Sequence, residues 1–487
     1  MQFLRKAVFY IFLIIYLIAC PLILLYAVGY IYKPGTKEGF VKTGLISVAT
    51  VPSGAKIYLN KSRYTQKSPA VIPELIPGSY SLKIFLKGHK EWIRTVRVEP
   101  EKATVFDKVI LLPDRLRSKE VLHGKFRDII SVPGTDFLVL ARSEKIDDIL
   151  AYNIKSNKAW PLLKSGMLFG GGEALSYFTE KESPYIIFCV KSPAGEKFLR
   201  VELAENKEAP AEDITKFFPT EPSRVFWHAS SPKDIFSYQK GSLNRIDLDS
   251  GQVYKKYIKN VKGFGLSENA LYVLANDNKL VKMDYDKKDR KILIDETTMN
   301  TFLFRGNDFY KIYPLGQEIF LFWGERGGLL TNNAPYNLEG EGIKGVSVNL
   351  QFDRAVLFKN DRVGVLDLSA EEISGEAIKP VKIKWIYKNA KNIEQVFWAH
   401  EASHVLFRDG NKVFLAGAFE DSGFSLNSIF DVADGSSIVY SDKTGEAYCL
   451  FQSPGSLFAS GIVPKKDIIE MPSVDTGQDK GKKYNGV

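Results

Sequence analysis

The sequence predicts an all-β protein that is attached to a membrane by one N-terminal helix. Residues 7–32 form an uncharged apolar run, short strand signals fill residues 43–113, and strand–turn–strand units recur loosely over residues 119–463. Alternation of apolar and polar residues between Gly, Pro and Asn turns is typical of strands, whereas an apolar run of about 20 residues is typical of a transmembrane helix. We therefore expect a membrane helix, a small sandwich and a large strand-rich region, in that order.

The apolar run, residues 7–32, is long enough to span a bilayer, because about 20 residues at a rise of ~1.5 Å cross a hydrocarbon layer ~30 Å thick. Pro21 would kink such a helix without abolishing it. Arg5 and Lys6 precede the run, and tyrosines crowd its far end as in aromatic belts at membrane interfaces: Tyr26, Tyr30 and Tyr32. We expect a single-pass anchor that contacts the lipid bilayer through residues 7–32.

The basic start favours a cytoplasmic N-terminus, residues 1–6, and extracytoplasmic C-terminal domains, at the cell surface or in the periplasm. Two alternatives for the leader stay open. The tetrapeptide Leu17-Ile18-Ala19-Cys20 resembles the bacterial lipobox, whose cysteine is lipidated after cleavage, although Pro21 follows it and the apolar run continues. The second alternative is that the leader is a signal peptide and is cleaved off, although the apolar region of a signal peptide spans only about 7–15 residues.

Composition restricts the class of partner and the redox chemistry. The 487 residues carry a formal net charge of +9, but Lys and Arg are scattered among Asp and Glu instead of forming a stripe, so we expect no nucleic-acid partner. The basic surface would suit anionic lipid or cell-wall polymer. Three cysteines cannot build a disulfide framework, and Cys189 and Cys449 lie in strand-like runs that predict buried thiols.

Residues 43–113 read as a small β-sandwich. In one run, apolar residues alternate with polar ones, which is the period of a strand with one buried face: Tyr80, Leu82, Ile84 and Leu86. Five runs with strand signals follow one another with turn residues between them: residues 45–51, 55–60, 79–86, 92–98 and 104–112.

The same stretch resembles the PEGA domain, a family named after a tetrapeptide that stands here as Pro52-Ser53-Gly54-Ala55, with serine in place of glutamate. Further landmarks follow in order: Ile57-Tyr58-Leu59-Asn60, Ser68-Pro69-Ala70, Leu75-Ile76-Pro77-Gly78-Ser79-Tyr80 and Gly88-His89. The resemblance implies an immunoglobulin-like sandwich of bacterial and archaeal surface proteins that acts as an interaction or spacer module without catalysis. Pro52 and Pro77-Gly78 are residues that favour turns, and we expect His89 to lie at the edge of a turn.

From residue 119 to 463, units of an aromatic strand, a polar turn and further strands recur at roughly 35–50 residues, the spacing of four-stranded propeller blades. The pattern predicts a 7- or 8-bladed β-propeller. It resembles WD40-like and TolB-like repeats, whose Trp-containing strand and Asp-Gly turn are echoed at Trp227, Trp398 and Asp434-Gly435. An irregular pair of β-sandwiches is the alternative.

One motif suggests catalysis. His400-Glu401-Ala402-Ser403-His404 matches H-E-x-x-H, in which two histidines on one helical face bind zinc while the glutamate acts on water. Alignment of the preceding Val396-Phe397-Trp398 with Val225-Phe226-Trp227 instead predicts a turn between two strands. We therefore keep a zinc-dependent hydrolase using His400, Glu401 and His404 only as an alternative.

Other motifs are weaker. Asp442-Lys443-Thr444-Gly445 resembles the phosphorylation loop of ion pumps but reads as a hairpin turn, Gly170-Gly171-Gly172 lacks the context of a nucleotide loop, and Asp147-Asp148 reads as a solvated turn. We assign no catalytic, cofactor-binding or metal residue and expect no enzyme and no cofactor.

The expected function is that of a membrane-anchored envelope protein whose propeller binds a protein or cell-wall polysaccharide, with a passive structural spacer as the alternative. Four tryptophans could contribute to binding or to the core: Trp227, Trp323, Trp385 and Trp398. Residues 464–487, rich in Lys, Asp and Gly, predict a disordered tail.

Overall fold

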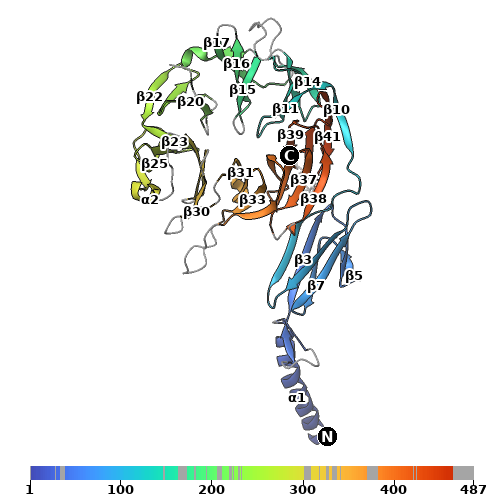
Figure 1. The fold of residues 1–487 in the computed structure, drawn as a ribbon. Helices are drawn as coiled ribbons and strands as arrows, with labels where there is room; N and C mark the ends of the chain where they lie inside the picture. Colours follow the sequence, from blue (N-terminus) through green and yellow to red (C-terminus); the bar gives the residue numbers. More distant parts are fainter. Residues whose placement is uncertain are drawn as a thin grey trace, which may run out of the picture.

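A computed structural model shows a helix, a small sandwich and a ring of sheets following one another along the chain (Figure 1). The expected tail, the glycine cluster at 170–172 and Asp147 lie outside the described residues. The residues described are 2–27, 29–32, 39–145, 148–162, 173–179, 183–192, 195–205, 211–218, 222, 224–228, 231, 233–300, 309–316, 319–324, 328–331, 337–339, 342–369, 382–419, 422–423 and 425–463.

The apolar run forms helix α1 (Gln2–Ala27), which reaches a mean hydropathy of 2.9 and is, among the described residues, the one helix long and apolar enough to span a membrane. It ends before residue 32, where we expected the anchor to end. Gly29 adopts a left-handed backbone (φ +87°) and donates its N–H to the carbonyl of Tyr26 (2.9 Å), which stops the helix. Strand β1 (Tyr30–Tyr32) then pairs with β2 (Phe40–Lys42).

The small sandwich consists of two sheets packed on one core, as the alternation predicted. Its centre is mostly apolar and includes Ile46, Ile57, Leu82 and Val96. One sheet has the order β6-β3-β9, made of β6 (Ala70–Leu75), β3 (Gly44–Val51) and β9 (Ala103–Ile110). The other has the order β5-β4-β7-β8, made of β5 (Ser62–Lys67), β4 (Lys56–Leu59), β7 (Gly78–Phe85) and β8 (Trp92–Val98).

The rest of the described chain forms antiparallel sheets that succeed one another around a central opening (Figure 1), as a propeller requires. Sheets do not stack in two layers, so the alternative of paired sandwiches is wrong. The first three sheets are β11 (Asp128–Ser131), β12 (Phe137–Ala141), β13 (Ile149–Asn153), β14 (Lys158–Pro161); β15 (Glu173–Thr179), β16 (Tyr185–Ser192), β17 (Gly195–Glu202), β18 (Ala211–Asp213); and β19 (Arg224–Trp227), β20 (Asp234–Gln239), β21 (Ser242–Asp247), β22 (Val253–Lys259).

One sheet of eight strands follows, in the order β26-β25-β24-β23-β27-β28-β29-β30. Its innermost strands β23 and β27 pair in parallel, which joins two four-stranded units edge to edge. The strands are β23 (Val261–Leu266), β24 (Leu271–Ala275), β25 (Leu280–Met283), β26 (Lys291–Ile294), β27 (Tyr310–Gly316), β28 (Ile319–Trp323), β29 (Leu329–Thr331) and β30 (Asn337–Glu339). A blade number of 7 or 8 stays a prediction.

The last sheets close the ring. Strand β10, from the N-terminal end of the propeller region, pairs with the C-terminal strand β41, so the two ends of the region hold each other by backbone hydrogen bonds. The strands are β31 (Gly345–Asn349), β32 (Arg354–Phe358), β33 (Arg362–Asp367), β34 (Lys384–Lys388); β35 (Ile393–Ala399), β36 (His404–Asp409), β37 (Lys412–Gly417), β38 (Leu426–Asp431); and β10 (Ser118–Phe126), β41 (Gly455–Gly461), β40 (Glu446–Cys449), β39 (Ile438–Ser441).

The small sandwich docks on the propeller. Ile110, the last residue of β9, and Leu112, just after it, are buried in an apolar cluster with residues of β36, β37, β39 and β40. Lys108 forms an ion pair with Glu401, and the Arg94 Nε donates to the carbonyl of Gly423 (2.9 Å). The two parts therefore share buried apolar surface and polar contacts.

Cys189 and Cys449 form no disulfide within the described residues and are buried in their strands, as predicted. Burial raises the pKa of the Cys449 thiol to about 12, so this group stays protonated.

Candidate functional site

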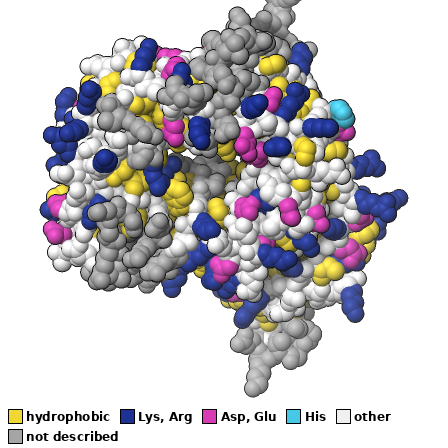
Figure 2. All heavy atoms as spheres, turned by 45° about the horizontal axis from the view of Figure 1, so that its top comes forward, with side chains coloured by type: hydrophobic (Ala, Val, Ile, Leu, Met, Phe, Trp, Pro, Cys, Tyr) yellow, Lys and Arg dark blue, Asp and Glu magenta, His cyan; other side chains and the backbone are white. Residues whose placement is uncertain are grey.

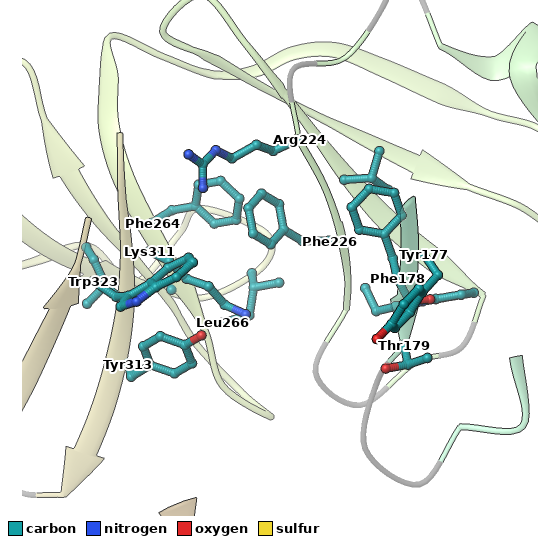
Figure 3. Close-up of a pocket in the computed structure, with 14 residues that line it drawn as sticks. Tyr177, Phe178, Thr179, Arg224, Phe226, Phe264, Leu266, Lys311, Tyr313 and Trp323 are labelled. Atoms are coloured by element: carbon teal, nitrogen blue, oxygen red, sulfur yellow. The ribbon is translucent and has the colours of Figure 1, made fainter. Parts of the chain in front are cut away.

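A pocket of about 520 Å³ lies on the inner side of the ring, between β15, β19, β23 and β27. In Figure 3, Tyr177 and Thr179 stand on one side of the space and Lys311, Tyr313 and Trp323 on the other. The lining combines aromatic rings, two basic residues and small or aliphatic residues: Tyr177, Phe178, Thr179, Arg224, Val225, Phe226, Trp227, Phe264, Gly265, Leu266, Lys311, Ile312, Tyr313 and Trp323.

Two glycines on β23, of which Gly265 lines the pocket, set how closely this strand approaches β27. A Cβ on Gly263 would lie 2.4 Å from the carbonyl oxygen of Tyr310, and a Cβ on Gly265 would lie 2.0 Å from that of Ile312. Only residues without a side chain therefore let β23 approach β27 closely enough to pair. The pairing aligns Phe264 with Lys311, which places an aromatic ring and a cation side by side.

Aromatic rings hold both cations of the pocket. The Lys311 ammonium lies 5.6 Å from the ring centroid of Phe226 and 4.8 Å from that of Tyr313. The Arg224 guanidinium lies 4.9 Å from the ring centroid of Phe309. Cation–π contacts of this kind stabilise the positions of the charges without neutralising them.

Among the residues that the structure describes, no acidic side chain lines the pocket, and neither Arg224 nor Lys311 forms an ion pair. Desolvation by the surrounding protein atoms, and then the charge of Asp128, raise the pKa of the partly exposed Tyr177, so its phenol stays protonated and available as a hydrogen-bond donor. The pocket therefore offers positive charge, aromatic faces and hydroxyl groups together.

The four candidate tryptophans divide into two pairs. Trp227 and Trp398 are buried, and each indole N–H donates to the first strand of the preceding sheet, to the carbonyl of Phe178 (3.2 Å) or Ser347 (3.0 Å). Trp323 and Trp385 are half-buried. Trp323 donates to the carbonyl of Lys344 (2.6 Å) and lines the pocket, whereas Trp385 lies beneath two cations of its own sheet.

The H-E-x-x-H motif lies on a turn between β35 and β36, as predicted. His400, Glu401 and Ala402 all have left-handed backbones (φ 50°, 55° and 53°), so the motif is not the right-handed helix that the zinc mechanism needs. Three neighbours hold this turn: Asp442 accepts the His400 N–H (3.2 Å), Arg354 donates to the carbonyl of Ala402 (3.0 Å), and Lys108 pairs with Glu401.

The two histidines of that motif serve packing. Their ring centroids lie 6.1 Å apart, and the His404 Nδ1 contacts the Ser403 hydroxyl (2.9 Å). Burial, and to a smaller extent the charge of His400, lowers the pKa of His404 to about 3, so the ring is neutral. Within the part of the chain that the structure describes, no group of three or more His, Cys, Asp or Glu is arranged to hold a metal ion.

The other motifs also lie in turns. His89 forms a single bridge with Pro113 and lies at the edge of the small sandwich, and its Nδ1 is 3.2 Å from the carbonyl oxygen of Lys87. Asp442 and the following three residues connect β39 to β40 as the predicted hairpin turn.

The comparisons with known proteins address both parts of the chain. The sequence model of the PEGA domain matches residues 43–111. The chain carries a PEGA domain. It is the small sandwich, and it confirms the resemblance carried by Pro52-Ser53-Gly54-Ala55. A comparison with curated proteins found no match.

Several solved propellers are similar to the chain at low identity. The β-propeller domain of Cps50 (Swd1) from Myceliophteria thermophila is 9% identical and aligns over 72% of this chain and 100% of its own length, with a TM-score of 0.39. The WD40 domain of SCAP from fission yeast is 11% identical over 71% of this chain and 94% of its own, with a TM-score of 0.40. These similarities concern the fold alone.

Sequence reasoning named Trp227 and Trp323 but missed the pocket itself. The sequence signal that could have found it is the alternation of exposed and buried residues along the first strand of a repeat unit. In β19, Arg224 and Phe226 are more exposed than Val225 and Trp227, and in β27 the same holds for Lys311 and Tyr313 around Ile312. A basic and an aromatic residue two apart on an inner strand point to one side.

Proposed function

We propose that this chain is a single-pass, membrane-anchored envelope protein whose propeller binds a protein or polysaccharide partner. The proposed parts are a cytoplasmic start (1–6), an anchor (7–32), the PEGA domain (43–113), the propeller (119–463) and a disordered tail (464–487). The observation that carries the proposal is the pocket on the inner strands, where half-buried Trp323 and Tyr313 stand beside Lys311. Concave sites lined by aromatic residues with a few polar groups are typical of binding sites.

The proposal makes the PEGA domain a rigid spacer between bilayer and propeller. The hydroxyl of Tyr26, at the end of α1, donates to Glu74 (2.5 Å), and the N–H of Thr43 donates to the carbonyl of Gly29 (2.9 Å). At its other end the domain packs on the propeller through Ile110 and Leu112. These contacts support a pocket held at a set distance from the membrane.

Binding is tested with the full-length protein in nanodiscs of zwitterionic lipid. The probes are an array of cell-envelope polysaccharides and a set of purified envelope proteins. Tyr313→Ala combined with Trp323→Ala removes two aromatic faces of the pocket, and Trp385→Ala is the matched control, since it removes a half-buried tryptophan outside the pocket. We expect binding that the double variant loses and the control keeps. A passive spacer would show no pocket-dependent ligand in either set.

The anchor is tested by charge insertion. Ile15→Arg places a charge near the centre of α1, where it costs about 2.5–3.5 kcal/mol on insertion scales. We expect the variant to be released from membranes by alkaline carbonate, while Ile15→Leu stays bound. Release of the unaltered protein would contradict the anchor, and protease protection of the propeller in sealed vesicles reports its side of the membrane.

A further inference from the structure

We infer that the pocket binds an acidic saccharide, a sugar chain that carries carboxylate or other anionic groups. The inference rests on the proposed function and names its ligand class. The described part of the lining contains two cations and no acid. Because Arg224 and Lys311 form no ion pair with the described residues, their charges are left for a ligand, and charge-assisted hydrogen bonds to an anion are stronger than neutral ones.

The cations are held in fixed positions. Lys311 lies between the rings of Phe226 and Tyr313, and Arg224 lies over Phe309. Phe226 in turn packs edge-on against Phe264, with ring centroids 4.8 Å apart. A flexible lysine would lose side-chain entropy on meeting an anion, and this packing removes part of that loss in advance.

The remaining lining suits a sugar ring. A pyranose has one apolar face of C–H groups and a rim of hydroxyls, so it packs on aromatic faces and hydrogen-bonds at its edge. Half-buried Tyr313 and Trp323 lie on one side of the pocket, and Tyr177, 45% exposed, lies opposite (Figure 3). Their rings supply faces, and the two tyrosines and Thr179 supply hydroxyls.

The shape favours a saccharide over a folded protein. The pocket, about 520 Å³, falls within the range of ~300–1,000 Å³ for small-ligand sites. A stable protein interface uses a broad surface of about 800 Å² per partner. Lys and Arg side chains, interspersed with Asp and Glu, also surround the opening of the ring on the face shown in Figure 2, where they would attract a longer anionic chain.

The test uses the full-length protein in zwitterionic nanodiscs and three probes: oligogalacturonate, its full methyl ester, and poly-glutamate. The ester keeps every ring and removes every charge. We measure dissociation constants at low salt by tryptophan fluorescence and calorimetry. The variant Arg224→Gln with Lys311→Gln removes the cations, and Lys359→Gln with Arg362→Gln is the control, because these cations lie over Trp385 outside the pocket.

We expect the acid form to bind at least about tenfold more tightly than its ester, and the pocket variant alone to abolish that preference. Equal affinity for acid and ester would overturn the inference while leaving polysaccharide binding intact. Binding of poly-glutamate without the saccharide would overturn it in favour of a protein partner. If no probe binds and the wider array also finds no pocket-dependent ligand, the inference and the proposed function both fail.

Discussion

At the scale of single residues, the tryptophans show how one residue type takes two roles. Trp227 and Trp398 occupy equivalent strand positions, and each hydrogen-bonds the neighbouring sheet. Trp323 is half-buried and lines the pocket, which the buried Trp227 also lines. The difference in burial comes from how the neighbouring sheets pack, because the alternation of residues along the strand is the same for a buried and for a half-buried tryptophan.

The first prediction concerns that bond between sheets. Trp227→Phe keeps an aromatic ring but removes the N–H that donates to Phe178, so the free energy of unfolding should fall by about 1 kcal/mol or more. Urea denaturation measures the change. Trp385→Phe is the control, since its indole N–H has no hydrogen bond within the described part of the chain, and an equal loss in both variants would contradict the role of the bond.

The second prediction concerns pH. His404 has a folded pKa of about 3, whereas its ordinary value is 6.5, so below pH 6.5 the unfolded chain binds a proton that the folded chain does not. Its stabilising contribution is complete above pH 6.5 and is lost as pH falls, by up to about 1.4 kcal/mol per unit.

Urea midpoints of the wild type and His404→Gln, determined from about pH 7.5 to about pH 5, provide the measurement, because this range begins above the ordinary pKa of histidine and ends below it. On acidification the variant should lose stability less steeply than the wild type, because its unfolding takes up about one proton fewer. Identical slopes would show that His404 titrates in the folded state and is less enclosed than the structure indicates.

At the scale of elements, the parallel pairing of β23 with β27 is a local departure from the usual ring of separate sheets. It depends on Gly263 and Gly265, whose missing side chains allow two backbones to meet. The alternation of these glycines with Phe264 and Leu266 also directs the larger residues to the pocket. This stretch of β23 therefore contributes both to a sheet junction and to the lining of the pocket.

The third prediction follows from that junction. Gly265→Ala would place a Cβ 2.0 Å from the backbone oxygen of Ile312, a contact that the sheet relieves only by separating the two strands. We expect a loss of about 1–3 kcal/mol in unfolding free energy and weaker ligand binding. Gly461→Ala is the control, because nothing lies within 4 Å of its Cβ. Equal stability of the two variants would contradict the junction.

At the scale of the whole molecule, the turn from His400 to Ser403 joins the PEGA domain to the propeller. It receives contacts from the PEGA domain and from two neighbouring sheets, through Lys108, Arg354 and Asp442. The motif that suggests zinc chemistry in the sequence is therefore, in the structure, a turn at the interface between the PEGA domain and the propeller. The left-handed backbone there is maintained by those neighbours.

The fourth prediction tests that junction with a double-mutant cycle. Lys108→Gln and Glu401→Gln should show a coupling energy of about 1 kcal/mol, because both side chains are largely shielded from water. The exposed pair of Lys102 and Glu99 is the control and should show coupling near zero. Equal coupling in the two pairs would mean that the domains do not dock as the structure shows.

Much of the fold follows from sequence patterns that act locally. The apolar run, the alternation around Leu82 and the turn at Gly54 each depend on residues close in the chain, and each predicted element is present. The strand on either side of the H-E-x-x-H turn was predictable for the same reason. Helix α1 ends before the apolar run does, because Gly29 adopts a left-handed backbone, and the bounds of the anchor itself stay a prediction.

By itself, the sequence determined a helix that suits a membrane, a PEGA sandwich and a strand-rich ring, because hydrophobic period and turn chemistry are short-range properties. Only the tertiary structure decided which residues meet. Tyr177, Arg224, Phe264 and Lys311 come from four strands far apart in the chain and converge because the sheets succeed one another around a ring. Such convergence depends on how sheets pack, and no local pattern encodes it.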